Sequence, residues 1–102
     1  MKKDYNIDTL CVQAGWTPKT GESRIPPIVQ STTFFYGDSQ AMADLFDLKR
    51  EGFFYSRLAN PTVDALEKRI AALEGGICGI GCASGMSAVL LTAMTLCEAG
   101  DN

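Results

Sequence analysis

Hydrophobic residues recur at helical spacing in the second half of the chain, after the pair Asn60-Pro61. The residues on this repeating face are Val63, Leu66, Ile70 and Leu73. An asparagine can cap a helix, a proline suits the first helical position, and the pair Gly75-Gly76 suits a helix end. The pattern therefore predicts one amphipathic helix between Asn60 and Gly75.

A second apolar stretch follows directly. Ile77–Ala83 is short and apolar on both faces, which is typical of a buried strand in a parallel sheet. A Ser84-Gly85 turn separates it from a second helix, which the pattern places from Met86 to Glu98. Because this second helix has hardly any polar face, we expect it to be covered on most sides.

The first half of the chain, up to Ala59, has scattered glycine and proline and no sustained period. One short helix is predicted from Ser39 to Arg50, with Ser39 as its cap. The stretch from Pro26 to Tyr36 ends in residues that favour β-structure, but its proline pair favours an edge or a clasp over a central strand. This half is therefore predicted to be an extended, loop-rich arm.

These elements predict an α/β fold that is incomplete within this chain. A parallel sheet needs several strands joined by crossovers, so one strand between two helices cannot bury helices this apolar. We expect the front end of a larger domain, with the arm at residues 1–59 and the start of the domain at residues 60–102. The longest uncharged stretch, residues 75–97, is broken at Ser84-Gly85 and is not expected to span a membrane.

Composition and charge narrow the chemistry. The 102 residues are 46% hydrophobic and 21% charged, which is ordinary globular usage. A net charge of −3 without a long basic run argues against nucleic acid as a partner. The chain has no histidine, which removes a common acid–base group and the commonest zinc ligand.

The four cysteines form no C-x-x-C pair, so no metal site is expected. The polar start at residues 1–4 is followed by no apolar leader, so secretion is not expected either. We therefore expect a cytoplasmic protein whose thiols are reduced and mostly buried.

The Ser84-Gly85 turn is a candidate anion site. Free N–H groups and the helix dipole attract phosphate to a helix N-terminus, and Gly85 permits a close approach. Simple helix capping by these two residues is the commoner role and stays open. A near match to the dinucleotide fingerprint, Gly79-x-Gly81-x-x-Ser84, is weak because both glycines fall inside the predicted strand.

Tyr55 and Arg57 form a second candidate site. In an extended segment, residues two apart project to the same side, so the hydroxyl and the guanidinium can converge on one anion. A packed tyrosine beside a surface ion pair is the alternative. No carboxylate pair or serine–histidine dyad is present, and we assign Glu67, Lys68 and Arg69 to the solvated face of their helix.

A series of short motifs runs in a fixed order through almost the whole chain. The motifs are Gln13-Ala14-Gly15, Thr20-Gly21, Pro26-Pro27-Ile28, Gln30-Ser31-Thr32-Thr33-Phe34, Tyr55-Ser56-Arg57-x-x-Asn60-Pro61-Thr62, Leu66-Glu67, Ala72-Leu73-Glu74-Gly75-Gly76 and Ala83-Ser84-Gly85-Met86-Ser87-Ala88. This order resembles the Cys/Met-metabolism family of pyridoxal-phosphate enzymes. Gln13 is a departure, since many members carry histidine there.

The resemblance implies a fold-type I pyridoxal-phosphate-dependent transferase, of which this chain holds the N-terminal arm and the first helix–strand–helix of the large domain. It also implies a homotetramer built from dimers. Carried over by position, Tyr55 and Arg57 bind the cofactor phosphate in the neighbouring subunit's site. The backbone N–H groups of Gly85 and Met86 bind the phosphate in their own subunit.

In such enzymes the lysine that holds the cofactor, and the other catalytic residues, fall beyond Asn102. The resemblance therefore implies no catalytic residue in this chain, and we expect the 102 residues to be inactive alone. The expected partners are a small amino-acid substrate and further copies of the chain, or a companion chain that completes the fold.

Within the family, the stretch Ala43–Lys49 looks most like O-acetylhomoserine sulfhydrylases, which make homocysteine from O-acetylhomoserine and sulfide in methionine biosynthesis. Methionine γ-lyase and cystathionine γ-synthase stay open as alternatives. A non-catalytic interaction fragment is the competing class, and it predicts that Arg57 is dispensable.

Overall fold

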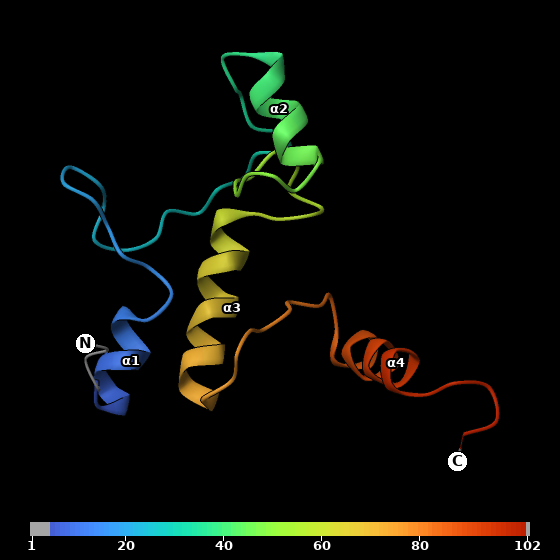
Figure 1. The fold of residues 1–102 in the computed structure, drawn as a ribbon. Coiled ribbons are helices and arrows are strands. Elements are labelled where there is room, and N and C mark those ends of the chain that lie inside the picture. The colour runs from blue at the N-terminus through green and yellow to red at the C-terminus, as the bar shows by residue number, and fades with distance from the viewer. Residues whose placement is uncertain (1–4, 102) are drawn as a thin grey trace.

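The computed structural model describes residues 5–101, so the polar start at residues 1–4 lies outside the described part. Four helices occur within that part, and long loops join them (Figure 1). They are α1 (Ile7–Gln13), α2 (Ser39–Phe46), α3 (Pro61–Glu74) and α4 (Gly85–Leu96). No helix in this part is long and apolar enough to cross a membrane.

α3 is confirmed as the sequence predicts it. The side chain of Asn60 accepts a hydrogen bond from the N–H of Thr62, and Pro61 is the first helical residue. Gly75 ends the helix in the left-handed conformation (φ 66°), and its N–H donates to the carbonyl of Ala71. Local capping chemistry therefore fixes both ends of α3.

α4 is also confirmed, with small shifts at its ends. It begins at Gly85 rather than Met86 and ends at Leu96 rather than Glu98. Ser84 is the cap, and it exchanges hydrogen bonds with Ser87 in a capping box.

The arm differs from the prediction in two ways. α2 is capped by Asp38 instead of Ser39 and stops at Phe46, because Leu48 adopts the left-handed conformation (φ 56°) that does not continue a helix. The second difference is α1, which the hydrophobic pattern does not predict. Its signals are short, namely Asn6 as the cap and one acidic residue in the first turn.

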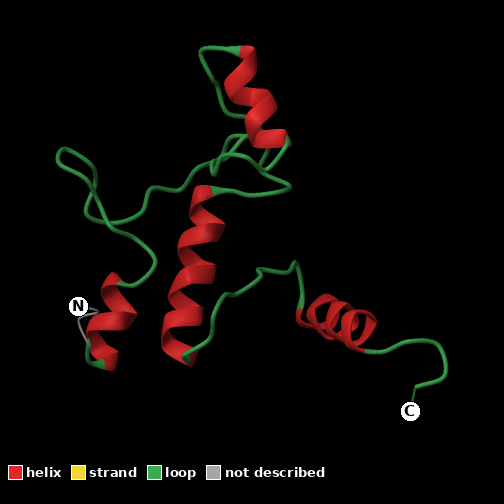
Figure 2. Cartoon of the chain, in the orientation of Figure 1, coloured by secondary structure: helices red, strands yellow, loops and turns green. Residues whose placement is uncertain are grey.

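The predicted strand at Ile77–Ala83 is wrong for this chain. Residues 5–101 contain no strand (Figure 2), and their only β-pairing is an isolated antiparallel bridge between Thr33 and Tyr55. A strand forms by pairing with a neighbour, and no neighbouring strand is present for this segment. The middle element of the predicted helix–strand–helix is therefore an unpaired connection.

α1 packs against α3, and these are the only helices in mutual contact within residues 5–101. Gly15, just after α1, has φ 81°, and a Cβ atom there would lie 2.1 Å from the carbonyl oxygen of Ala65. Arg69 of α3 donates from Nε to the carbonyl of Ala14 (2.8 Å) and from Nη2 to that of Val12 (3.3 Å). Glycine thus permits the close approach, and the arginine satisfies carbonyls at the end of α1.

Most apolar side chains are left uncovered. The chain has 8900 Å² of accessible surface, whereas a compact protein of its mass would have roughly 5600 Å². Of the predicted apolar face of α3, Val63, Leu66 and Ile70 are exposed, while the small residues Ala65 and Ala71 are buried. Ala65 lies where the end of α1 approaches α3 at Gly15, whereas Ala71 lies beside Gly76, just after α3.

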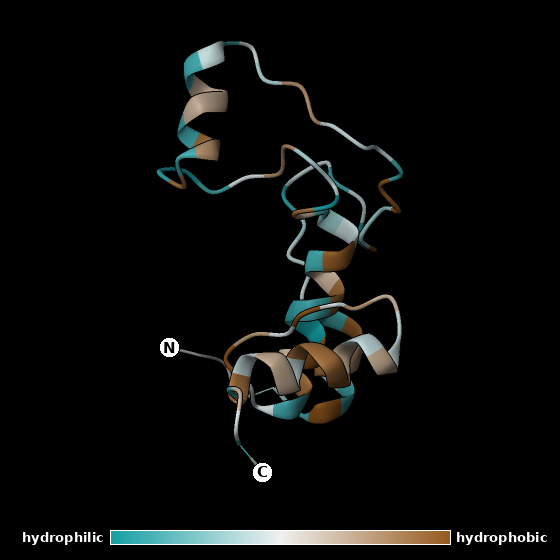
Figure 3. Cartoon of the chain, turned by 90° about the vertical axis from the view of Figure 1, so that its right-hand side faces the viewer, coloured by the Kyte–Doolittle hydropathy of each residue, from teal (hydrophilic) through white to brown (hydrophobic). Residues whose placement is uncertain are grey.

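α4 shows the same feature more strongly. Figure 3 shows it in front, and much of its ribbon is brown or pale, the colours of hydrophobic and intermediate residues. Its large exposed side chains are Met86, Val89, Leu90, Leu91, Met94 and Leu96. The expectation of mostly buried thiols is also wrong, since all the cysteines, Cys11, Cys78, Cys82 and Cys97, are free and exposed.

Candidate functional site

The loop that carries Tyr55 and Arg57 is tied to an earlier part of the arm. Beside the Thr33–Tyr55 bridge, the N–H of Ser56 donates to the carbonyl of Thr32 (2.9 Å). The guanidinium carbon of Arg57 lies 5.1 Å from the centre of the Tyr55 ring. The structure therefore brings these two predicted residues together, with the cation over the aromatic face.

A polar hub just after this pair holds the loop in place. Asn60 is 8% exposed, and its side-chain amide donates to the carbonyl of Val29 (3.1 Å) and to the hydroxyl of Ser56 (2.9 Å). The hydroxyl of Thr62 accepts from the N–H of Val29 (2.9 Å) and donates to the carbonyl of Pro27 (3.1 Å). The hub positions the segment between Arg57 and α3 through these polar contacts.

Gly85 and Met86 are the first two residues of α4, and both are exposed. The first N–H groups of a helix have no partner within the helix, and Ser84 satisfies only that of Ser87. A Cβ atom on Gly85 would have no other atom within 4 Å. Two N–H donors and open space are therefore available at the start of α4.

The two pairs of predicted residues do not meet within one chain. Figure 1 shows the loop before α3 at one end of that helix, whereas α4 lies away from this loop. No hydrogen bond joins Tyr55 or Arg57 to Gly85 or Met86 within residues 5–101.

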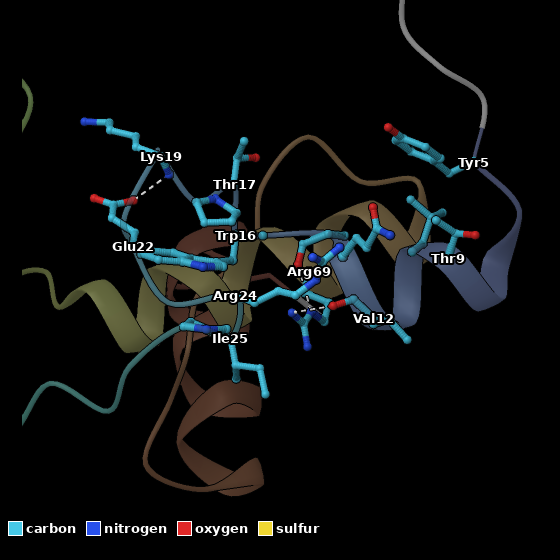
Figure 4. Close-up of a pocket in the computed structure, with 16 residues that line it drawn as sticks. Tyr5, Thr9, Val12, Trp16, Thr17, Lys19, Glu22, Arg24, Ile25 and Arg69 are labelled. Carbon is cyan, nitrogen blue, oxygen red and sulfur yellow. Dashed lines mark hydrogen bonds between the residues drawn. The ribbon is translucent and has the colours of Figure 1, made fainter.

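A separate hollow lies around α1 and the loop after it (Figure 4). It measures about 850 Å³ and includes Trp16, Lys19, Glu22 and Arg69 in its lining. Two of its polar groups bind neighbouring groups of the same loop, since Trp16 Nε1 donates to the Ser23 carbonyl and Lys19 N–H donates to Glu22 Oε2. This hollow is a structural junction and contains none of the four predicted site residues.

The solvated face assigned to Glu67, Lys68 and Arg69 is correct only for Lys68, which makes an exposed ion pair with Asp64. Arg69 holds the end of α1, and Glu67 Oε1 accepts from the N–H of Gly81 (2.6 Å). Sequence reasoning missed these roles because helical periodicity does not show which side a neighbouring segment contacts.

The candidate donor set fits a phosphate group. It comprises a phenol, a guanidinium and two backbone N–H groups, with no carboxylate among them, and such donors suit a multiply charged anion. No cluster of three metal-ligating side chains occurs in residues 5–101. The arrangement can therefore bind an anion, and it contains no group placed for acid–base catalysis.

Comparison with known proteins gives the class of protein. A family model described as Cys/Met metabolism PLP-dependent enzyme matches residues 8–102. The chain therefore belongs to this family of pyridoxal-phosphate-dependent enzymes, and the resemblance seen in the motifs is confirmed.

Individual relatives point to sulfhydrylases. Sulfhydrylase FUB7 of Fusarium oxysporum f. sp. lycopersici is 50% identical over 98 residues, which cover 95% of this chain and 23% of that protein. O-acetyl-L-homoserine sulfhydrylase 1 of Thermus thermophilus is 48% identical over 97 residues, covering 94% of this chain and 23% of that protein.

A solved structure confirms the fold of the matched part. The crystal structure assigned as an O-acetylhomoserine (thiol)-lyase of Campylobacter jejuni matches with a TM-score of 0.87 and 38% identity, over 97% of this chain and 24% of that one. It carries N'-pyridoxyl-lysine-5'-monophosphate at position 205 of its chain. This chain thus spans about a quarter of the length of the relatives it matches.

Proposed function

We propose that these residues are the N-terminal part of a pyridoxal-phosphate enzyme that makes homocysteine from O-acetylhomoserine and sulfide. The observation that carries the proposal is the match of residues 8–102 to the family, together with 48% identity to an O-acetyl-L-homoserine sulfhydrylase. When bound, pyridoxal phosphate supplies the electron sink for such chemistry. The role of this chain is to bind and orient the phosphate end of that cofactor.

The phosphate contacts come from two places in the chain. The hydroxyl of Tyr55 and the guanidinium of Arg57 bind phosphate in the site of a neighbouring subunit, and the N–H groups of Gly85 and Met86 bind it in their own. The separation of the two pairs within one chain supports this division. A dimer is then required for a complete site.

The same proposal covers assembly and activity. The enzyme is a cytoplasmic homotetramer built from dimers, or a companion chain completes the fold. The exposed apolar faces of α3 and α4 support the need for further protein, and the four free cysteines suit a reducing compartment. Within residues 5–101, no acid–base group lies beside the proposed phosphate donors, so we expect the 102 residues to have no turnover alone.

The reaction is tested by assaying the protein purified from its own cells. We expect homocysteine from O-acetylhomoserine and sulfide. Release of methanethiol from methionine without homocysteine synthesis would indicate a γ-lyase instead, and cystathionine formation from an acylated homoserine and cysteine would indicate a γ-synthase. Absence of all three activities would favour a non-catalytic interaction fragment.

The phosphate role of Arg57 is tested in a completed enzyme, in which this chain replaces the matching 97-residue segment of the Thermus thermophilus relative. Loss of a charge-assisted hydrogen bond is worth about 1.5–3 kcal/mol, so Arg57→Ala should weaken pyridoxal phosphate binding by at least about tenfold. Pyridoxal, which lacks the phosphate, should bind unchanged. Arg50→Ala, on an exposed arginine of the same loop region, is the matched control, and equal effects of both variants would contradict the assignment.

A further inference from the structure

The connection between α3 and α4 lies along α3, and two glycines make this possible. A Cβ atom on Gly79 would lie 2.9 Å from the backbone carbonyl oxygen of Glu67. A Cβ atom on Gly81 would lie 3.2 Å from Cγ1 of Val63 and 3.4 Å from Oε1 of Glu67. Side chains at these positions would push the connection away from the helix, so the glycines keep it close to α3.

One side chain ties this connection to the helix. Oε1 of the half-buried Glu67 accepts a hydrogen bond of 2.6 Å from the N–H of Gly81. A bond from a backbone N–H to a carboxylate is charge-assisted and therefore stronger than a neutral one. Within residues 5–101, no other side-chain hydrogen bond joins residues 77–84 to α3.

This bond lies close in the chain to the start of α4. Ser84, the cap of α4, comes three residues after Gly81, and the N–H groups of Gly85 and Met86 come next. The connection has no strand partner in the described part of the chain. The Glu67 carboxylate therefore supplies the side-chain hydrogen bond, within residues 5–101, that joins α3 to the segment leading into α4.

We propose that Glu67 is a positioning residue: by holding the N–H of Gly81 against α3, it places the N–H donors of Gly85 and Met86 for the phosphate group. This inference rests on the proposed function, because it assumes that those donors bind the cofactor phosphate. Glu67 itself does not touch the cofactor. Its effect should therefore depend on the phosphate and on an acceptor oxygen at this position, not on negative charge alone.

The test uses the completed enzyme and two ligands, pyridoxal phosphate and pyridoxal. Glu67→Ala should weaken pyridoxal phosphate binding by about tenfold, as expected for loss of a charge-assisted bond, and leave pyridoxal binding unchanged. Glu67→Gln keeps an acceptor oxygen and should stay within about threefold of the unsubstituted enzyme, since a neutral bond replaces the charged one. Glu74→Ala, which removes an exposed carboxylate at the end of the same helix, should change neither affinity.

The outcomes separate this inference from the function beneath it. If the unsubstituted enzyme binds both ligands equally well, the phosphate site is wrong and the inference is overturned with it. If that enzyme prefers pyridoxal phosphate and Glu67→Ala keeps the full preference, only the inference is overturned. Equal loss of both ligands in Glu67→Ala would show a general structural role and would also overturn it.

Discussion

Two regions of this chain differ in the contacts that hold them in place. From α1 to α3, polar groups tie distant segments together, as in the hub around Asn60 and the contact of Arg69 with the end of α1. From residue 76 onward, α4 is mainly apolar and contacts no other helix in the described part of the chain. Within residues 5–101, the bond between Glu67 and Gly81 is the only side-chain hydrogen bond that joins residues 77–84 to α3.

The difference shows which interactions can form within a chain that spans about a quarter of its relatives' length. A hydrogen bond needs only its two partners, so the polar ties form within this chain. Burial of α4 needs a surrounding sheet and further helices, and these are not among residues 5–101. The radius of gyration, 16.8 Å, agrees, since a compact domain of about 100 residues has about 13 Å.

The largest expected effect is on the contact between α1 and α3. Gly15→Ala would place a Cβ atom 2.1 Å from the Ala65 carbonyl, so left-handed strain of about 1–2 kcal/mol is joined by overpacking of about 1–3 kcal/mol. In the completed enzyme, amide hydrogen exchange along α1 should accelerate by at least about thirtyfold, the equivalent of about 2 kcal/mol. Gly21→Ala has similar strain (φ 87°) with no atom within 4 Å, and α1 should keep its protection there. Equal effects would mean that the close approach is unimportant.

The next effect concerns the polar hub. Asn60→Ala removes the cap of α3, worth about 1 kcal/mol, and leaves the Val29 carbonyl without its donor, at a further cost of about 1–2 kcal/mol. Exchange in the first turn of α3 and in residues 27–33 should rise together. Asn60→Asp keeps the capping oxygen but not the amide donors. In this variant, exchange should stay slow in the first turn of α3 and rise only in residues 27–33. Protection of both segments in Asn60→Ala would contradict the hub.

A smaller effect is expected at Arg69. Arg69→Ala removes two hydrogen bonds to carbonyls at the end of α1, which lie partly in solvent, so the expected loss is about 1–2 kcal/mol. Exchange near residues 12–16 should rise about tenfold. Lys68→Ala removes only an exposed i,i+4 ion pair and serves as the neighbouring control. A loss no greater than that of the control would show that α1 does not need this contact.

The smallest effect is expected at Lys49. Its ion pair with Asp47 joins side chains that are 65% and 57% exposed, and such pairs contribute about 0–1 kcal/mol. Lys49→Ala should change exchange in α2 by less than about fivefold, the equivalent of about 1 kcal/mol. A larger change would show that polar contacts in the arm are stronger than their exposure indicates.

Features that depend on residues close together in the chain could be predicted from the sequence. The ends of α3 follow from Asn60, Pro61 and Gly75, whose capping preferences act within a few residues. Tyr55 and Arg57 lie together as predicted, but the extended segment assumed for them is wrong: the N–H groups of Leu58 and Ala59 donate to the Tyr55 carbonyl, so Arg57 lies in a turn.

Contacts between distant segments could not be predicted. Asn60 reaches Val29 across 31 positions, and Arg69 reaches Ala14 across 55. Periodicity shows that α3 has an apolar face, but not that α1 docks beside Ala65. The segment at Ile77–Ala83 has the composition of a strand, but whether it forms one depends on pairing with a neighbouring strand.

The central claim is that these residues belong to a pyridoxal-phosphate enzyme whose cofactor is held covalently outside residues 1–102. It is tested most directly by intact mass spectrometry under denaturing conditions, after borohydride reduction of the protein purified from its own cells. We predict the pyridoxyl increment on a longer polypeptide that contains this sequence, or on a companion chain purified with it. A pyridoxyl increment on an 11.0 kDa species, or an unmodified 11.0 kDa species alone, would contradict the claim.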